Sequence, residues 1–137
     1  MKNIKYRIIR DNQYNFLSAD GTLISDQWFD MAWDFKNGYA RVKLKDKGFN
    51  LINTDGKYLC DHWFDWADNF YHGFARIELK DKWNFINTEG EYLCDQWFDW
   101  VYNFYFGGCA QVKLNEKYNF INRKGEIVSD QWFDNFV

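Results

Sequence analysis

A unit of about 35 residues recurs four times along this chain of 137 residues, and this repetition limits the folds open to it. A turn glycine recurs at intervals of 35, 34 and 35 residues, at Gly21, Gly56, Gly90 and Gly125. A Trp-Phe-Asp triplet keeps the same spacing and begins at Trp28, Trp63, Trp97 and Trp132. Units of this size cannot bury an apolar face alone, so they stack on their neighbours in sequence.

Each copy predicts three short strands, which are clearest in the third copy. Residues 75–79 alternate between apolar and charged side chains, which is typical of a half-buried strand. A turn at residues 80–82 leads to a second strand at 83–87. Gly90 then provides a tight turn in which one residue has a positive φ, and a third strand follows over about residues 92–98.

Composition and phase together predict an all-β fold. Aromatic residues make up 23% of the chain, proline is absent, and no segment suits a helix of ordinary length. We expect a single repeat domain over residues 1–137 that contains four three-stranded β-meanders joined by looser linkers such as 99–106. The repeats cover approximately residues 3–37, 38–72, 73–107 and 108–137. No copy is split between the two ends of the sequence, which favours an open, solenoid-like stack over the alternative of a propeller-like closure.

Further motifs resemble those of the WG-repeat family of bacterial β-rich repeats. Residues 35–42 and 70–77 follow the pattern Phe-x-x-Gly-x-Ala-x-Val or Ile. The chain departs from the family at the glycine of the Trp-Gly pair, where it has Asn15, Asn50, Asn84 and Asn119. Because Asn tolerates left-handed backbone geometry, we expect a retained bulge or kink there. The resemblance implies interaction or ligand binding and transfers no catalytic residue.

Charge and hydropathy exclude several classes of protein. A net charge of −3 argues against a protein that binds nucleic acid polymers, which usually has a basic surface. No apolar run approaches the ~20 residues of a membrane-spanning helix, and the first ten residues do not resemble a signal peptide. We therefore expect a cytoplasmic protein without membrane contact. Its three cysteines, Cys60, Cys94 and Cys109, are then expected to be free thiols.

No pattern of reactive residues predicts an enzyme or a cofactor. Asp26 and Asp30 flank an aromatic pair and suit turn hydrogen bonds better than calcium binding. The two histidines, His62 and His72, fall at different repeat positions and are too few for a zinc site. We expect no catalytic site, metal or cofactor.

Large aromatic residues in the linkers are the first candidate binding surface. Flat rings provide a large contact area at a low cost in entropy, which suits recognition of a protein partner. The alternative is that the rings fill gaps between stacked repeats. The residues concerned are Trp33, Trp66, Trp100, Tyr71, Tyr102, Tyr105 and Phe106.

A stripe of arginines is the second candidate. Arg7, Arg41 and Arg76 share one repeat position, and the fourth copy has Gln111 there. Together with the linker aromatics they suit a small anionic ligand such as a nucleotide, or a sugar, in a binding or sequestering protein. The alternative is an ordinary solvated face. Protein–protein interaction is our leading hypothesis, and exposed strands at the two ends of an open array also favour pairing between copies of the chain.

Overall fold

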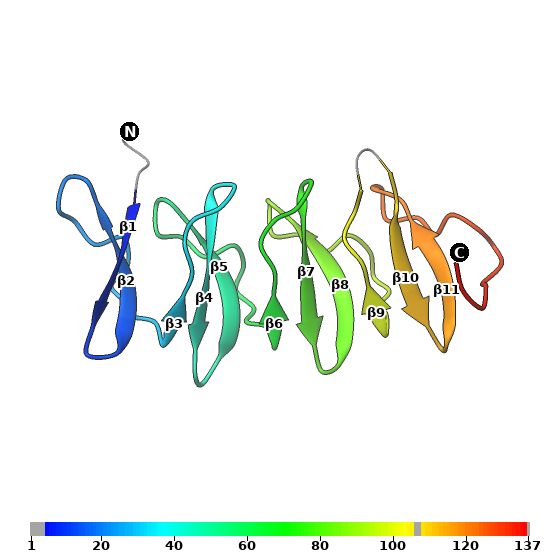
Figure 1. Ribbon diagram of the computed structural model, residues 1–137, viewed down its shortest axis with the longest axis horizontal. Helices are drawn as coiled ribbons and strands as arrows, with labels where there is room; N and C mark the ends of the chain where they lie inside the picture. Colours follow the sequence, from blue (N-terminus) through cyan, green and yellow to red (C-terminus); the bar gives the residue numbers. More distant parts are fainter. Residues whose placement is uncertain (1–4, 106–107, 137) are drawn as a thin grey trace. The chain divides into compact units, whose positions relative to one another are not determined.

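The computed structural model describes residues 5–105 and 108–136, in which the regular elements are all β-strands. They form two compact units, one ending at Asn69 and one beginning at Phe70, close to the boundary expected between the second and third repeats. The first unit contains β1 (Lys5–Arg10), β2 (Gln13–Ser18), β3 (Met31–Ala32), β4 (Tyr39–Leu44), β5 (Gly48–Asn53) and β6 (Trp66–Ala67) (Figure 1). The second contains β7 (Phe74–Leu79), β8 (Lys82–Asn87), β9 (Trp100–Val101), β10 (Ala110–Leu114) and β11 (Lys117–Ile121).

The described residues form small antiparallel sheets of two or three strands in tandem, which confirms the predicted all-β repeat fold. Among the described strands of the first unit, β1 pairs with β2 alone, and a second sheet has the order β3-β4-β5. In the second unit, the sheet order β9-β10-β11 repeats that arrangement. The prediction of a single domain over residues 1–137 stays a prediction.

The third strand of each three-stranded sheet is not where the sequence predicted it. Residues 92–98 make only isolated bridges, between Tyr92 and Ile86 and between Phe98 and Trp83. The third strand is instead β9, which lies in the linker that we expected to be irregular and pairs with β10 of the following repeat. β3 pairs with β4 in the same way. β3 and β9 therefore each complete the sheet of the following repeat within their own unit.

The repeated asparagines act through their side chains, so the prediction of a left-handed kink at these positions is wrong. Asn15, Asn50, Asn84 and Asn119 lie in strands, are buried and are not among the residues with positive φ. The Nδ2 of Asn50 donates to the carbonyl oxygens of Cys60 (3.1 Å) and His62 (3.2 Å). Its Oδ1 accepts from the backbone N–H of Leu51. The amide thus satisfies the backbone of the segment after the glycine turn, which is why that segment does not form a regular strand.

The glycine turns have the predicted positive φ, and the turn predicted at residues 80–82 is a two-residue hairpin connection before β8. Gly56 has φ +83°, and a Cβ atom there would lie 1.9 Å from the carbonyl oxygen of Ile24 in the preceding repeat. Only glycine allows this approach of one repeat to the next. Lys80 and Asp81 both have positive φ between β7 and β8, as the right-handed twist of a hairpin requires.

The core of the first unit is continuous between its repeats. Phe16 and Phe29 come from the first repeat and pack in one cluster with Val42 and Ile52 of the second. The ring of Phe29 also meets the ring of Tyr58 at 6.3 Å between centroids. Stacking of neighbouring repeats therefore buries apolar area that a single repeat would leave exposed, as the sequence predicted.

Candidate functional site: arginine–aromatic clusters and linker tyrosines

Arg41 is held inside an aromatic cluster of the first unit. Its guanidinium carbon lies 4.4 Å from the ring centroid of Trp33 and 5.1 Å from that of Trp66. One terminal nitrogen donates to the carbonyl oxygen of Ala67 (3.4 Å). Burial lowers the pKa of Arg41 from its ordinary value, and the charge of Asp68 opposes that shift. The cation is therefore part of the packing between the two linkers that flank the second repeat.

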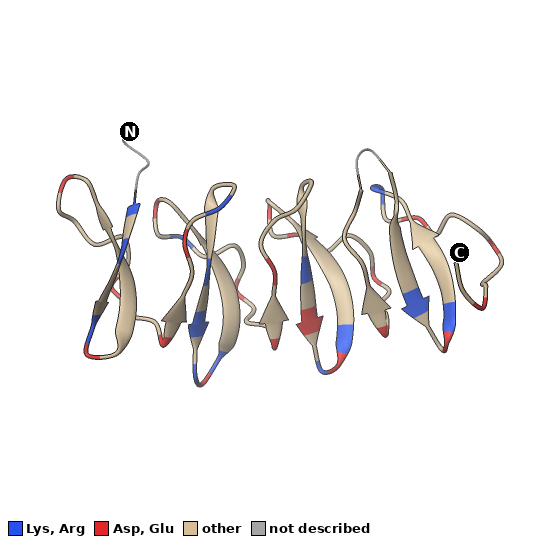
Figure 2. Ribbon diagram, in the orientation of Figure 1, with Lys and Arg blue, Asp and Glu red and all other residues tan. Residues whose placement is uncertain are grey.

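Arg76 repeats this arrangement in the second unit. Its guanidinium carbon lies 5.5 Å from the ring centroid of Trp83 and 5.3 Å from that of Trp100. It donates to the carbonyl oxygen of Val101 (3.1 Å), which corresponds to Ala67 in the first unit. Figure 2 shows basic residues on β4 and β7, the strands that carry Arg41 and Arg76. The same repeat position therefore binds the backbone of the following linker strand twice.

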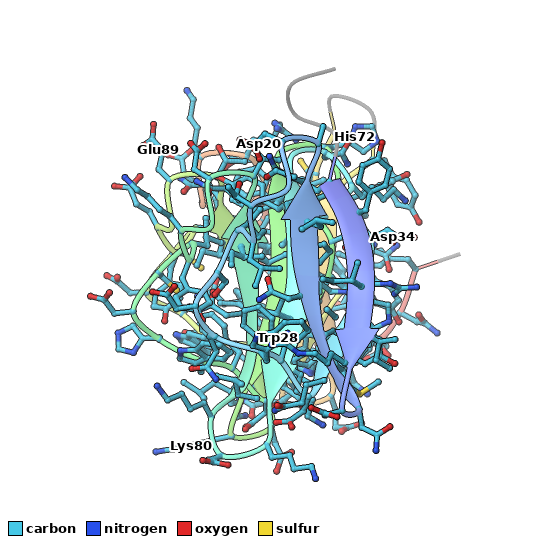
Figure 3. The ribbon with its side chains drawn as sticks, turned by 90° about the vertical axis from the view of Figure 1, so that its left-hand side faces the viewer. Asp20, Trp28, Asp34, His72, Lys80 and Glu89 are labelled. Carbon is cyan, nitrogen blue, oxygen red and sulfur yellow. The ribbon has the colours of Figure 1, made fainter. Side chains whose placement is uncertain are left out.

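Arg7 makes the same backbone contact in a more open setting. It donates to the carbonyl oxygen of Ala32 (2.9 Å), and its Nε lies 3.6 Å from the carboxylate of Asp34. Asp34 lies beside β1 in Figure 3. The first linker has Met31 where the others have Trp66 and Trp100, so the ring of a tryptophan is missing from this cluster.

Gln111 replaces the arginine in the fourth repeat, and a cleft lies there instead. The cleft has a volume of about 470 Å³ and is lined by Gln111, Phe120, Phe133, Asn135 and Phe136. Asn135 occupies the position of Trp66 and Trp100. Neither a cation nor a large ring is therefore present at these two positions of the fourth repeat.

The linker aromatics divide into packed and exposed side chains. Trp33, Trp66 and Trp100 are half-buried and contact arginines or other rings, such as Phe49 at 5.0 Å from Trp66. The tyrosines are more exposed, at 42% for Tyr71, 38% for Tyr102 and 62% for Tyr105. Phe106, which we predicted with them, lies outside the described residues. The predicted arginines and tryptophans thus form local clusters, of which the one with Trp33 and Arg41 joins the first linker to the second repeat, and none of the nine predicted residues lines the cleft of the fourth repeat.

The aspartates of the Trp-Phe-Asp triplets bind turns of the protein itself. Asp30 accepts a hydrogen bond from the backbone N–H of Lys45 (2.7 Å), and Asp99 accepts one from Asn115 (2.8 Å). Asp99 also pairs with Lys82, and these hydrogen bonds lower the pKa of its carboxyl group. This confirms the turn hydrogen bonding predicted for Asp30, although the sequence did not identify the hairpin turn of the following repeat as the donor. Within residues 5–105 and 108–136, no three His, Cys, Asp or Glu side chains gather as a metal site would require.

The thiols of Cys60 and Cys94 occupy equivalent, half-buried positions. Burial raises the pKa of both thiols, and each thiol also donates a hydrogen bond to a backbone carbonyl oxygen, that of His62 for Cys60 and that of Gln96 for Cys94. A thiol with a raised pKa is a poor nucleophile at neutral pH. These thiols have the environment of packing residues.

Comparison with known families fits this geometry. The family described as WG containing repeat matches residues 20–47, 51–83 and 85–118, which is well over half of the chain. This chain belongs to the WG-repeat family. The three matched segments follow one another in tandem, as the repeat spacing of this WG-repeat chain requires.

Other comparisons give only distant similarity to the WG-repeat chain. No curated protein matches it. Among solved structures, it is similar to the computationally designed Ika8 protein (10% identity, 95% of this chain and 48% of that one, TM-score 0.48). A protein of unknown function from Bacteroides caccae (16%, 86% and 53%, TM-score 0.39) and BamB from Moraxella catarrhalis (13%, 87% and 42%, TM-score 0.43) are also similar. The chain spans about half the length of each of these structures.

The described ranges contain no helix with the length and apolar character needed to cross a bilayer.

Proposed function

We propose that this WG-repeat chain is a non-catalytic protein-interaction module whose contact surface is built from the exposed tyrosines of the linkers. The observation that supports this proposal is the difference in solvent exposure between the tryptophans and the tyrosines of the linkers. The tryptophans are occupied by packing against arginines, whereas Tyr71, Tyr102 and Tyr105 present between 38% and 62% of their surface to solvent. Tyrosine is enriched at protein interfaces because its rigid ring buries a large area and its hydroxyl retains a polar contact.

The position of these tyrosines supports a surface that can vary without loss of the fold. Tyr71 and Tyr105 share one repeat position, and the first linker has Lys36 there. Tyr102 shares its position with Trp33 and Asp68. Such variation between copies is expected where a side chain faces a partner instead of the common core.

The arginine clusters weaken the alternative of a nucleotide- or sugar-binding protein. The guanidiniums of Arg41 and Arg76 donate to backbone carbonyls and lie against tryptophan rings of their own units. An anionic ligand would have to replace these contacts. This favours a protein partner over a small ligand.

Two further points support a non-catalytic, cytoplasmic protein. The thiols of Cys60 and Cys94 have raised pKa values, which is opposite to the activation that a catalytic cysteine needs. The three cysteines are unpaired, which suits a reducing compartment. Fractionation of the host cell tests the proposed location, and recovery in the membrane or secreted fraction would contradict it.

Affinity capture from a host lysate, followed by mass spectrometry of proteins and small molecules, tests the proposal. The wild-type chain is compared with a variant that carries Tyr71→Ala, Tyr102→Ala and Tyr105→Ala. We expect the variant to keep its melting temperature and to lose at least tenfold in the recovery of a specific protein. A specifically enriched nucleotide or sugar, with no enriched protein, would support the ligand alternative instead.

Two control variants separate recognition from packing. Tyr92→Ala removes a tyrosine of comparable exposure, 39%, that lies outside the linkers, and it is expected to leave capture unchanged. Trp66→Ala is expected to lower stability by about 2–3 kcal/mol, since the ring is half-buried against Arg41 and Phe49. Equal loss of partner with Tyr92→Ala would argue against a surface formed by the linker tyrosines.

A further inference from the structure

Three features inside the units define how one repeat joins the next. First, Phe29 of the first repeat is fully buried and meets Tyr58 of the second. Second, Gly56 lies against the carbonyl oxygen of Ile24, and Gly125 lies in the same way against that of Leu93. These contacts belong to two separate junctions, one in each unit, and show that the junction has a constant geometry.

Third, a linker strand pairs with the first strand of the following repeat. Met31 lies opposite Lys43 and Ala32 opposite Val42, where β3 joins β4. The backbone N–H of Asp30 donates to the carbonyl oxygen of Lys43, and that of Asp99 donates to Lys113 in the second unit. The same register is therefore used in both units.

The fourth repeat presents one half of this junction to solvent. Phe133 occupies the position of Phe29 yet is 42% exposed, and Val128 occupies the position of Ile24 and is 55% exposed. Asn135 and Phe136 occupy the positions of Met31 and Ala32 and line the cleft beside Gln111. The segment of Asn135 and Phe136 therefore corresponds to a linker strand, but no described strand of this unit pairs with it on its outer side.

The first repeat exposes to solvent the residues that form the other half of the junction. Among the residues that the structure describes, its β1 pairs only with β2, and Ile9, which corresponds to Lys43, is exposed together with Tyr6. A Cβ atom at Gly21 would meet no atom within 4 Å, in contrast to Gly56. Leu23, which corresponds to Tyr58, is also exposed. An exposed strand edge with apolar side chains is a template for pairing with another chain.

We propose that the first repeat of one copy binds the fourth repeat of a second copy, head to tail, and reproduces the junction seen within the units. Asn135 then lies opposite Ile9, Phe136 lies opposite Ile8, and Phe133 packs on Leu23. Gly21 approaches the carbonyl oxygen of Val128. The interface is heterologous, because the two copies contribute different surfaces. It does not involve Tyr71, Tyr102 or Tyr105, so it is independent of the proposed partner surface.

Disulfide trapping tests the register directly. In a chain with Cys60→Ser, Cys94→Ser and Cys109→Ser, one preparation carries Ile9→Cys and another, with an added tag, carries Asn135→Cys. Residues opposite one another in an antiparallel pair have Cα atoms about 4.5–5.5 Å apart, which suits a disulfide. On mild oxidation of the mixture, we expect a linked dimer of one tagged and one untagged chain as the main product.

A shifted control distinguishes this register from random collision. Arg10→Cys replaces Ile9→Cys and moves the thiol by one residue to the other face of β1, so the yield of mixed dimer is expected to fall at least fivefold. Equal yields from the two variants, or an Ile9→Cys preparation that links to itself as readily, would overturn the head-to-tail register. So would a link formed only within one chain when both cysteines are present together.

Sedimentation equilibrium tests association in the unmodified chain. The weight-average mass is expected to rise above 16.7 kDa with concentration. Val128→Asp places a charge on the apolar face of the fourth repeat and is expected to hold the chain as a monomer with an unchanged melting temperature. Gln96→Asp adds the same charge to an exposed site of the third repeat that belongs to neither surface, and it is expected to associate like wild type. A wild-type chain that stays monomeric up to millimolar concentration would overturn the proposal.

Discussion

The junction between the first and second repeats and the outer face of the fourth repeat use the same motif in opposite environments. At the junction, Phe29 is fully buried and Arg41 lies between two tryptophans. On the outer face, Phe133 is exposed, and Gln111 and Asn135 border a cleft. The local backbone is nevertheless the same, because Tyr118 and Phe133 exchange the hydrogen bonds that Tyr14 and Phe29 exchange. The conformation of a repeat is thus set within the repeat, whereas its burial depends on the neighbour.

The largest expected effect is on the free energy of unfolding, when the same Phe→Ala substitution is made at the two equivalent positions of this motif. Phe29→Ala empties a fully buried site and is expected to lower the free energy of unfolding by about 4 kcal/mol. Phe133→Ala, at a half-exposed site, is expected to cost about 1 kcal/mol. Urea denaturation at low protein concentration measures both values. Similar losses at the two sites would show that the neighbouring repeat does not determine burial.

Alanine at the glycine turns gives the next effect. Gly56→Ala and Gly21→Ala both place a Cβ on a residue with positive φ, which costs about 1–2 kcal/mol. Only Gly56→Ala also forces a Cβ against the carbonyl oxygen of Ile24, so its total cost is expected to be about 3 kcal/mol. Thermal unfolding of the two variants checks the difference. A cost at Gly21 as large as that at Gly56 would contradict it.

Rebuilding the missing cluster in the fourth repeat is expected to stabilise the chain. Gln111→Arg with Asn135→Trp supplies the cation and the ring that Arg41 and Trp66 provide in the second repeat. We expect a gain of about 1 kcal/mol from the cation–π contact and the hydrogen bond to the linker backbone. Gln111→Met with Asn135→Trp fills similar space without charge and serves as the control. Equal stabilisation by both pairs would assign the effect to volume alone.

The smallest effect is a dependence of stability on alkaline pH. Burial raises the pKa of Cys60 and Cys94, so the folded chain keeps these thiols protonated at a pH where the unfolded chain loses the protons. The free energy of unfolding keeps its full value below the ordinary thiol pKa of about 8.5. It declines as the pH rises from that value through the higher pKa of the folded chain. Urea denaturation between pH 7 and 9.5 is expected to show this decline. Cys60→Ser with Cys94→Ser, which copies the residues at positions 25 and 129, should remove it.

Sequence patterns predicted the turns better than the strands. Positive φ at Gly21, Gly56, Gly90 and Gly125 followed from the residue type alone, because glycine has no Cβ to clash in that conformation. The strand β9 was missed because two residues carry too little periodicity to identify a strand, and its pairing partner lies in the next repeat. The role of Asn50 was also missed, since its two acceptors are carbonyl groups, which every residue has.

The arginine clusters show what a closer comparison of the copies would have revealed. Arg41 and Arg76 are each followed by a tryptophan in the next linker, whereas Gln111 is followed by Asn135 and Arg7, the exception among the arginines, by Met31. This pairing within one chain indicates contact. It does not indicate that the guanidinium is used in packing and is directed to a backbone carbonyl, since the same residue types also bind anions in open sites.

By itself, the sequence determined the repeat length, the all-β class and the position of the four repeated glycine turns, because these depend on local conformational preferences that recur in each copy. Tertiary structure decided which aromatic rings are buried and which are available, and which strand completes each sheet. Those outcomes depend on contacts between repeats, where identical residues such as Phe29 and Phe133 have different surroundings. The physical reason is that burial depends on the neighbouring repeat, whereas φ and ψ preferences belong to the residue itself.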